Sequence, residues 1–155
     1  MQRHDAVRDE LSSWVSDQGV STRTEQIMPK WSTSTEQARL DIVCMDPRRG
    51  EICVDISVTD SVTEGVTKRV MRSSTRREQQ KHKRYPGRGL VPFVLDTRGR
   101  WGREAHAFVN TIAATLPWEE RADAIRDCKR RIAVALQTAV AEQIMSAAKR
   151  RGSES

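Results

Sequence analysis

The chain has no apolar run that approaches the length of a membrane span, and its N-terminus lacks the apolar core of a signal peptide. Its cysteines are odd in number and widely spaced, with no C-x-x-C pair: Cys44, Cys53 and Cys128. Two of them fall in apolar strand-like segments, where a free thiol acts as a small hydrophobic residue. These features predict a reducing compartment, the nucleus or the cytoplasm, and argue against a zinc site.

Other common catalytic and modular patterns are also missing. The histidines, His4, His82 and His106, show no metal-ligand spacing, and no Ser/His/Asp arrangement suggests a covalent intermediate. The 155 residues contain no internal repeat and no long linker. We therefore expect one domain over residues 1–149, with a core at 4–115, a helical extension at 119–149 and a disordered tail at 150–155.

The charge balance, by contrast, is strongly one-sided. The sequence has 27 Lys and Arg residues against 21 Asp and Glu residues, a formal net charge of +6. Net charge bears on binding partners and solubility rather than on fold. Nucleic acid, DNA or RNA, is the partner class that fits this balance best.

Two segments show the alternation of half-buried strands. Apolar residues occupy the even positions, namely Leu40, Ile42, Cys44, Ile52, Val54, Ile56 and Val58. The intervening residues 46–50 contain Pro47 and Gly50 and predict a hairpin loop. Asp41 and Asp55 are both odd-numbered, so both should point to the same side of the sheet, away from the apolar face.

If Met45 faces Glu51 across the hairpin, Asp41 faces Asp55 directly. Opposed side chains on neighbouring strands have Cβ atoms about 5 Å apart. Two carboxylates that close repel each other, and one pKa should rise unless a cation lies between them. Oxygen ligands suit Mg²⁺, which takes one or two carboxylates and keeps several waters. The alternative is that both acids are solvated residues on an exposed face.

The remaining elements follow from periodicity and turn signals. Ser61-Val62-Thr63-Glu64 matches a helix capping box, and Pro86-Gly87 ends the helix that it opens. The order of expected elements is a helix at 4–17, a strand at 20–28, a loop at 29–37, the hairpin, a helix at 61–84, a strand at 90–95, a helix at 103–115 and one long or two shorter helices at 119–149. A strand–helix–strand passage implies a crossover into a mixed sheet with the two acids near its middle.

The helix after the hairpin is rich in cations. The residues expected to contact nucleic acid are Lys68, Arg69, Arg72, Arg76, Arg77, Lys83, Arg84 and Tyr85. Cations repeated along a helix match a phosphate backbone and position it without reading its sequence. The alternative is a solvated basic face. Trp31 and Trp101 lie in or beside loops and are expected to pack against the domain edge.

An apolar stripe also runs along the C-terminal helix. Its members are Ala122, Ile125, Ile132, Leu136, Val140 and Ile144. This stripe could join the domain core or pair with a second copy in a homodimer, and the sequence leaves both outcomes open.

These features together resemble the PD-(D/E)xK, or restriction-endonuclease-like, superfamily. More narrowly, they resemble nuclease-like segments at the C-terminal ends of non-LTR retroelement reverse-transcriptase polyproteins. The resemblance spans most of the chain and rests on His4-Asp5-Ala6-Val7-Arg8-Asp9, Arg39-Leu40-Asp41-Ile42-Val43, Val54-Asp55-Ile56-Ser57-Val58, the segment 81–85, Val91-Pro92-Phe93 and Val134-Ala135-Leu136-Gln137. It implies an α/β fold with a helix–three strands–helix–strand core, a mixed central sheet flanked by helices, and additional C-terminal helices.

The resemblance also implies roles for individual residues. Asp41 and Asp55 would be metal ligands, together with the backbone carbonyl of Ile56, for Mg²⁺ or Mn²⁺. Glu10 matches an acid that many members carry on the first helix near the metal.

Two positions depart from the family pattern. Leu40 replaces the family proline, and Ser57 stands where the catalytic lysine should be. Some members supply that lysine from the following helix, which makes Lys81 the candidate here and Lys83 the second choice. Lys81 precedes Tyr85 by four residues, so both lie on one helical face.

The function implied is metal-dependent endonucleolytic hydrolysis of DNA, an activity that would nick target DNA for a mobile element. Two alternatives stay open: a catalytically degenerate nuclease fold that binds nucleic acid, and an assembly protein that uses the basic helix alone.

Overall fold

The computed structural model describes residues 2–60 and 67–154, and the side chains of residues 67–73 lie outside that description. The elements, in chain order, are α1 (Arg3–Asp17), β1 (Ser21–Ile27), the 3-10 helix η1 (Pro29–Trp31), β2 (Arg39–Asp46), β3 (Gly50–Thr59), α2 (Thr67–Arg84), β4 (Leu90–Asp96), α3 (Arg103–Ala113) and α4 (Trp118–Ser153). The predicted capping box at 61–64 lies outside the described residues.

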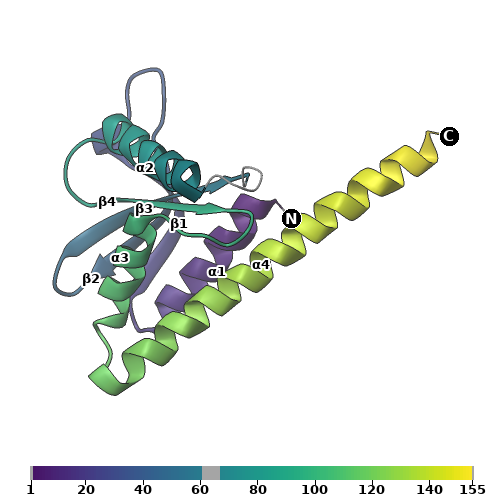
Figure 1. The fold of residues 1–155 in the computed structure, drawn as a ribbon. Coiled ribbons are helices and arrows are strands. Elements are labelled where there is room, and N and C mark those ends of the chain that lie inside the picture. Colours follow the sequence, from purple (N-terminus) through teal and green to yellow (C-terminus); the bar gives the residue numbers. More distant parts are fainter. Residues whose placement is uncertain (1, 61–66, 155) are drawn as a thin grey trace.

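The four strands form one mixed sheet in the order β1-β2-β3-β4 (Figure 1). β1, β2 and β3 pair antiparallel, and β4 joins β3 in parallel after α2. Among the described residues, the expected mixed α/β class is therefore confirmed. A parallel neighbour needs a crossover connection, and α2 provides it.

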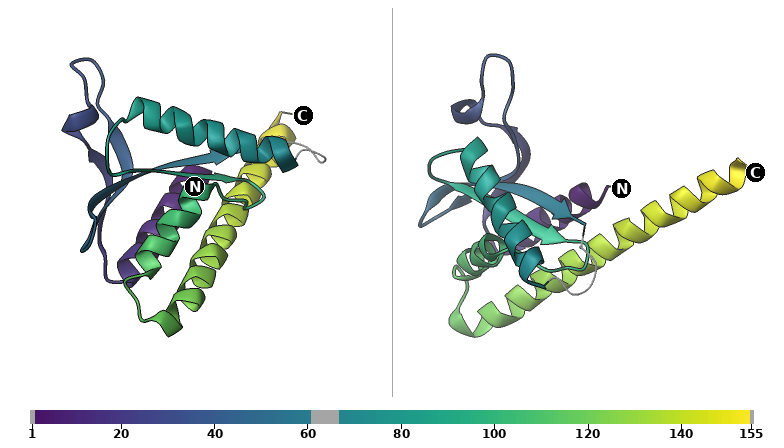
Figure 2. Two further views of the ribbon diagram at one scale, coloured as in Figure 1. Left: turned by 60° about the vertical axis from the view of Figure 1, so that its left-hand side comes forward. Right: turned by 45° about the horizontal axis from the view of Figure 1, so that its top comes forward.

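One face of the sheet carries the main core, built with α1, α3 and α4, and α2 covers the other face (Figure 2). Ile42, Val54 and Ile56 point into the main core with α1 residues Leu11 and Trp14. This arrangement agrees with the parity predicted for the even positions. The odd-numbered Val43 and Cys53 lie in the smaller cluster on the other side, and Asp55 faces Lys81 of α2.

Leu40 is the exception to that parity. It packs in a smaller cluster with Cys53 and Tyr85, on the opposite side from Ile42. The β2–β3 register stops at Ile42↔Val54, and Glu25, on β1, has a positive φ of 52°. The strands are thus distorted beside Asp41, and the regular alternation does not extend to Leu40.

The C-terminal segment forms a single helix rather than two. α4 runs to Ser153 and so includes residues 150–153, which the sequence predicted to be a disordered tail. Good helix formers run up to Arg151, although Gly152 is a poor one, and Arg150 and Arg151 near the carboxyl end interact favourably with the helix dipole. The last turns project away from the rest of the chain (Figure 1).

Only part of the predicted α4 stripe is buried. Ile132 and Leu136 lie in the main core, whereas Ile144 is 65% exposed and Met145 61% exposed. The stripe thus contributes to the intramolecular core over its middle part, and the homodimer stays a prediction. None of the described helices is long and apolar enough to span a membrane.

Candidate metal and nucleic-acid site

The hairpin brings Asp41 and Asp55 together as predicted. Met45 pairs with Glu51 and Ile42 with Val54, and this register ends one residue before Asp41 and Asp55. The backbone amide of Ile56 donates a 2.7 Å hydrogen bond to Oδ2 of Asp41, which holds that carboxylate beside β3. Each of the two carboxyl groups also affects the pKa of the other, as expected for neighbouring acids.

Lys81 reaches this pair from α2. Its Nζ atom lies 2.9 Å from Oδ2 of Asp55, and the two side chains are 17% and 9% exposed. This distance is that of an ion pair. Oδ2 of Asp55 is buried and makes no aligned hydrogen bond with the described residues, so the contact with Lys81 is electrostatic rather than a well-aligned hydrogen bond. The structure therefore brings Lys81 to the acids, and its catalytic role stays a prediction.

His4, on the first turn of α1, contacts the other acid. Its Nε2 atom lies 2.9 Å from Oδ1 of Asp41. The sequence interpretation missed this residue because it compared the histidines only with one another. A signal was available: His4 precedes Val7 by three residues and Leu11 by seven, so it continues the buried stripe of α1.

The environment drives the pKa values of the two acids apart. Burial acts to raise the pKa of Asp41, but bonding to His4 and to the Ile56 amide outweighs it and leaves that pKa below its usual value. Burial raises the pKa of Asp55, and the ion pair with Lys81 offsets this only in part. Hydrogen bonding to Asp41 raises the pKa of His4 to about 9, so the imidazole is positively charged at neutral pH.

Glu10 lies elsewhere, contrary to its predicted role. Its Oε1 atom accepts a 2.6 Å bond from Nε of Arg131 on α4, and Arg131 also contacts Asp17 and Ser13. Glu10 follows His4 by six residues, about 9 Å along the helix and on a different side of it. Since the side of α1 that carries His4 faces the acids, Glu10 points to α4 instead. Its bond with Arg131 links α1 to α4.

The neighbours of the acids on β3 complete the site. Ser57 follows Asp55 on the same side of the strand and is 6% exposed. Its short hydroxyl side chain carries no positive charge, so it cannot do what a lysine at this position would do. In a strand, the amide and carbonyl of one residue point to the same edge. Because the Ile56 amide points toward Asp41, its carbonyl should face the same edge, where the predicted oxygen ligand would have to be.

The donor set matches the chemistry of a hard divalent cation. Two carboxylates and one carbonyl supply oxygen alone, and one buried oxygen of Asp55 has no aligned hydrogen bond. No cluster of three or more His, Cys, Asp or Glu side chains suited to a metal occurs within residues 2–60 and 67–154. A bound Mg²⁺ or Mn²⁺ would therefore rely on Asp41, Asp55, the Ile56 carbonyl and water.

The basic surface of α2 is only partly as predicted. Arg76, Arg77 and Lys83 are exposed, and Arg84 is exposed but pairs with Glu36 at 2.9 Å. Tyr85 is 5% exposed and packs at 5.5 Å from Trp31, so its ring is part of the smaller cluster rather than a surface for stacking on bases. The side chains of Lys68, Arg69 and Arg72 lie outside the described residues.

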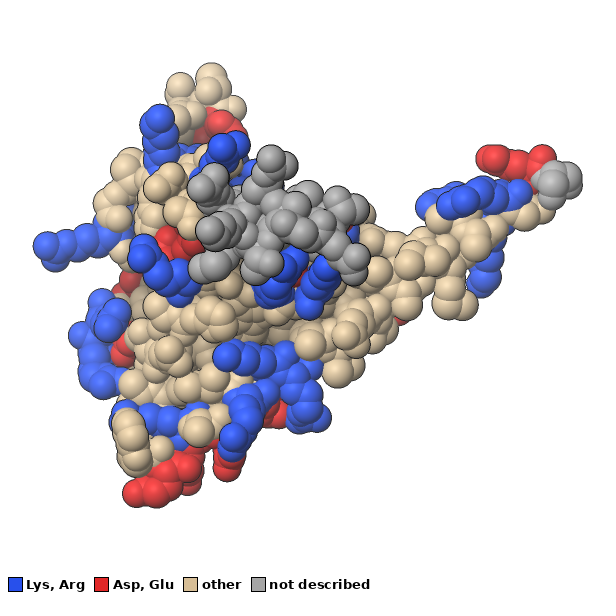
Figure 3. Space-filling view, in the orientation of Figure 1, with Lys and Arg blue, Asp and Glu red and all other residues tan. Residues whose placement is uncertain are grey.

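The wider surface carries several separate basic patches. Figure 3 shows Lys and Arg side chains spread over this face, with Asp and Glu among them.

No family model matches the chain, and the search of curated proteins also gave no match. The functional argument therefore rests on the geometry of the acids and their cationic neighbours.

Proposed function

We propose that the chain is a metal-dependent endonuclease that hydrolyses phosphodiester bonds in DNA. The observation that carries the proposal is the 2.9 Å contact between Lys81 Nζ and Asp55 Oδ2. It supplies a half-buried lysine beside two carboxylates on adjacent strands, although Ser57 stands where the lysine of the PD-(D/E)xK pattern is expected. The element order helix–three strands–helix–strand supports a restriction-endonuclease-like topology.

Each group of residues would have a different role in the reaction. Asp41, Asp55 and the Ile56 carbonyl would hold the metal, which when bound polarises a phosphoryl oxygen and acidifies water. Lys81 would stabilise the negative charge that develops on the phosphate in the transition state. Exposed Arg76, Arg77 and Lys83 would hold the DNA backbone without reading its sequence.

A second function is favoured by a specific observation. His4 and Lys81 already neutralise Asp41 and Asp55, and the described residues offer no third carboxylate. Such a site would be stable without metal, as in a degenerate nuclease fold that only binds nucleic acid. The two functions differ in whether a divalent cation displaces these contacts.

A cleavage assay tests the proposal. The full chain is incubated with supercoiled plasmid and with single-stranded DNA in Mg²⁺ or Mn²⁺, and binding is measured in parallel in EDTA. We expect metal-dependent nicking that Asp55→Ala abolishes while DNA binding persists. DNA binding by the wild type without cutting in either metal would contradict the nuclease function and would favour the nucleic-acid-binding function.

A further inference from the structure

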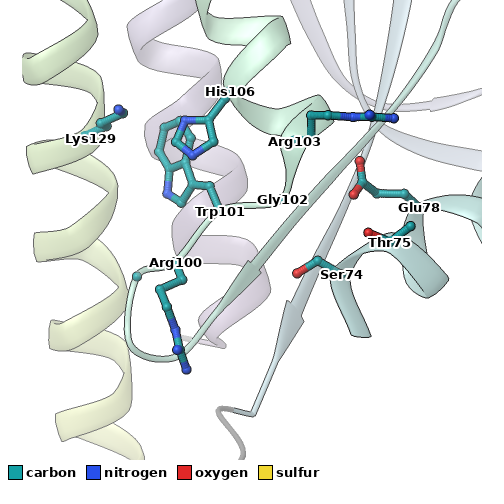
Figure 4. Close-up of a pocket in the computed structure, with 10 residues that line it drawn as sticks. Ser74, Thr75, Glu78, Arg100, Trp101, Gly102, Arg103, His106 and Lys129 are labelled. Atoms are coloured by element: carbon teal, nitrogen blue, oxygen red, sulfur yellow. The ribbon is translucent and has the colours of Figure 1, made fainter. Parts of the chain in front are cut away.

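A pocket of about 640 Å³ opens one turn of α2 away from Lys81 (Figure 4). Its walls come from α2, from the loop that follows β4, from α3 and from α4, through residues that include Glu78, Trp101, Arg103, His106 and Lys129. The volume lies within the range of small-ligand sites. The position, beyond the carboxyl end of a parallel strand, is where α/β folds commonly bind ligands.

One wall of the pocket is aromatic. The rings of Trp101 and His106 lie 5.3 Å apart at a 36° angle, and Trp101 meets Phe93 edge-on at 5.0 Å. Trp101 also forms a backbone bridge with Leu95 of β4. Because the core fixes Trp101 on one side, the aromatic wall is preorganised for a planar ligand.

Glu78 gives the pocket a polar edge. The residue is 6% exposed, and its Oε2 atom accepts a 3.0 Å hydrogen bond from the amide of Glu104 at the start of α3. A carboxylate has about four lone-pair sites, so capacity to accept remains. Gly102 keeps this edge open, because a Cβ atom there would lie 3.2 Å from Oε1 of Glu78.

The rim of the pocket is cationic. Lys129 is exposed and its Nζ atom lies 5.9 Å from the centre of the Trp101 ring. Arg103 is also exposed and lies beside Glu78 (Figure 4). Arg100 lines the pocket too, but its charge is already engaged by Asp96 at 2.8 Å. Lys129 is therefore the side chain beside the aromatic pair that is placed for a phosphate, whereas Arg103 lies on the opposite side, next to Glu78 (Figure 4).

We propose that this pocket binds one unpaired nucleotide of a nucleic acid. The base would lie against Trp101 and His106, an exocyclic amino group would donate to Glu78, and the phosphate would contact Lys129. Adenine, cytosine and guanine carry such an amino group, and thymine does not. The inference rests on the proposed function only in taking nucleic acid as the ligand class.

The test is a calorimetric titration of the full chain in EDTA with dAMP, dCMP, dTMP and deoxyribose 5-phosphate. We expect dAMP and dCMP to bind more tightly than dTMP, and the base-free sugar phosphate to bind least. Lys129→Ala should weaken dAMP binding about tenfold, the loss expected for one charge-assisted contact. Arg126→Ala, on the same helix as Lys129 but paired with Asp123, should leave binding unchanged.

Two results would overturn the proposal. One is no binding of any mononucleotide at millimolar concentrations, and the other is dAMP binding that Lys129→Ala leaves intact. Glu78→Gln, which keeps an acceptor for the Glu104 amide, should reduce the preference for dAMP over dTMP without unfolding the chain. Asp55→Asn should leave dAMP binding unchanged. A failure of the proposed nuclease activity can therefore be distinguished from a failure of nucleotide binding in the pocket.

Discussion

Nζ of Lys81 lies 2.9 Å from Oδ2 of Asp55, although the two residues belong to α2 and β3 and are separated by the connection between them. The relationship matters because Ser57, two residues after Asp55 on the same side of the strand, is buried beside it. A lysine from either position would bring its ammonium group to the same carboxylate.

This equivalence predicts a rescue. Lys81→Ala should lower DNA cleavage roughly hundredfold or more, because it removes a cation from the developing phosphate charge. Adding Ser57→Lys to that variant should restore part of the rate, measured as plasmid nicking in Mg²⁺. Lys83→Ala is the matched control, since Lys83 lies on the same helix but is exposed. A double variant as inactive as Lys81→Ala, with its fold intact, would contradict the shared role.

His4 predicts a pH dependence of stability. Its pKa is raised from 6.5 to about 9 by Asp41, so the folded chain binds more protons than the unfolded chain between these values. The stabilisation is therefore complete below about pH 6.5 and is lost as the pH rises through 9. Urea unfolding in EDTA at pH 6 and pH 9.5 should show a larger decline for the wild type than for His4→Gln. Equal declines would mean that the contact does not contribute.

Glu10 and Arg131 should matter for stability rather than for cleavage. Glu10→Gln weakens the bonds between α1 and α4, and we expect the free energy of unfolding to fall by about 1 kcal/mol. Urea denaturation measures it, with Arg130→Ala as the control because Arg130 pairs only within α4 and is 72% exposed. A loss of cleavage in Glu10→Gln at unchanged stability would instead place Glu10 at the acids.

The three thiols should be unreactive in the folded chain. Burial raises the pKa to about 12 for Cys44 and Cys128 and to about 11 for Cys53. At pH 8 the thiolate fraction is then roughly one in a thousand or less, and reagent access is also blocked. Ellman's reagent should titrate all three cysteines in guanidinium chloride and almost none without it. Rapid labelling of the native chain would contradict the burial of these three side chains.

The sequence was informative where local patterns decide the structure. Alternation and the turn at Pro47 predicted the hairpin register that pairs Met45 with Glu51 and brings Asp41 and Asp55 close together. Helical spacing alone put Lys81 and Tyr85 on one face of α2, and both do face inward. The same spacing could not tell that Tyr85 would be buried against Trp31, because that contact depends on where the loop at 29–37 folds back.

The errors arose from tertiary packing. Glu10 was assigned to the acids from the family pattern, yet Arg131, far away in the sequence, draws it to α4. Leu40 broke the parity because the strand is distorted beside Asp41. His4 was overlooked because its partner is a carboxylate on another element rather than a second histidine. The spacing of His4 from Val7 and Leu11 showed which side of α1 it occupies, but no short stretch of sequence names the partners of His4, Glu10 or Leu40.

Glu78 and Lys81 lie one turn apart on α2, and they hold that helix to two different parts of the chain: Glu78 to the first turn of α3, and Lys81 to the centre of the sheet. Because the two contacts lie on adjacent turns, they fix the rotation of α2 about its own axis as well as its distance from the sheet.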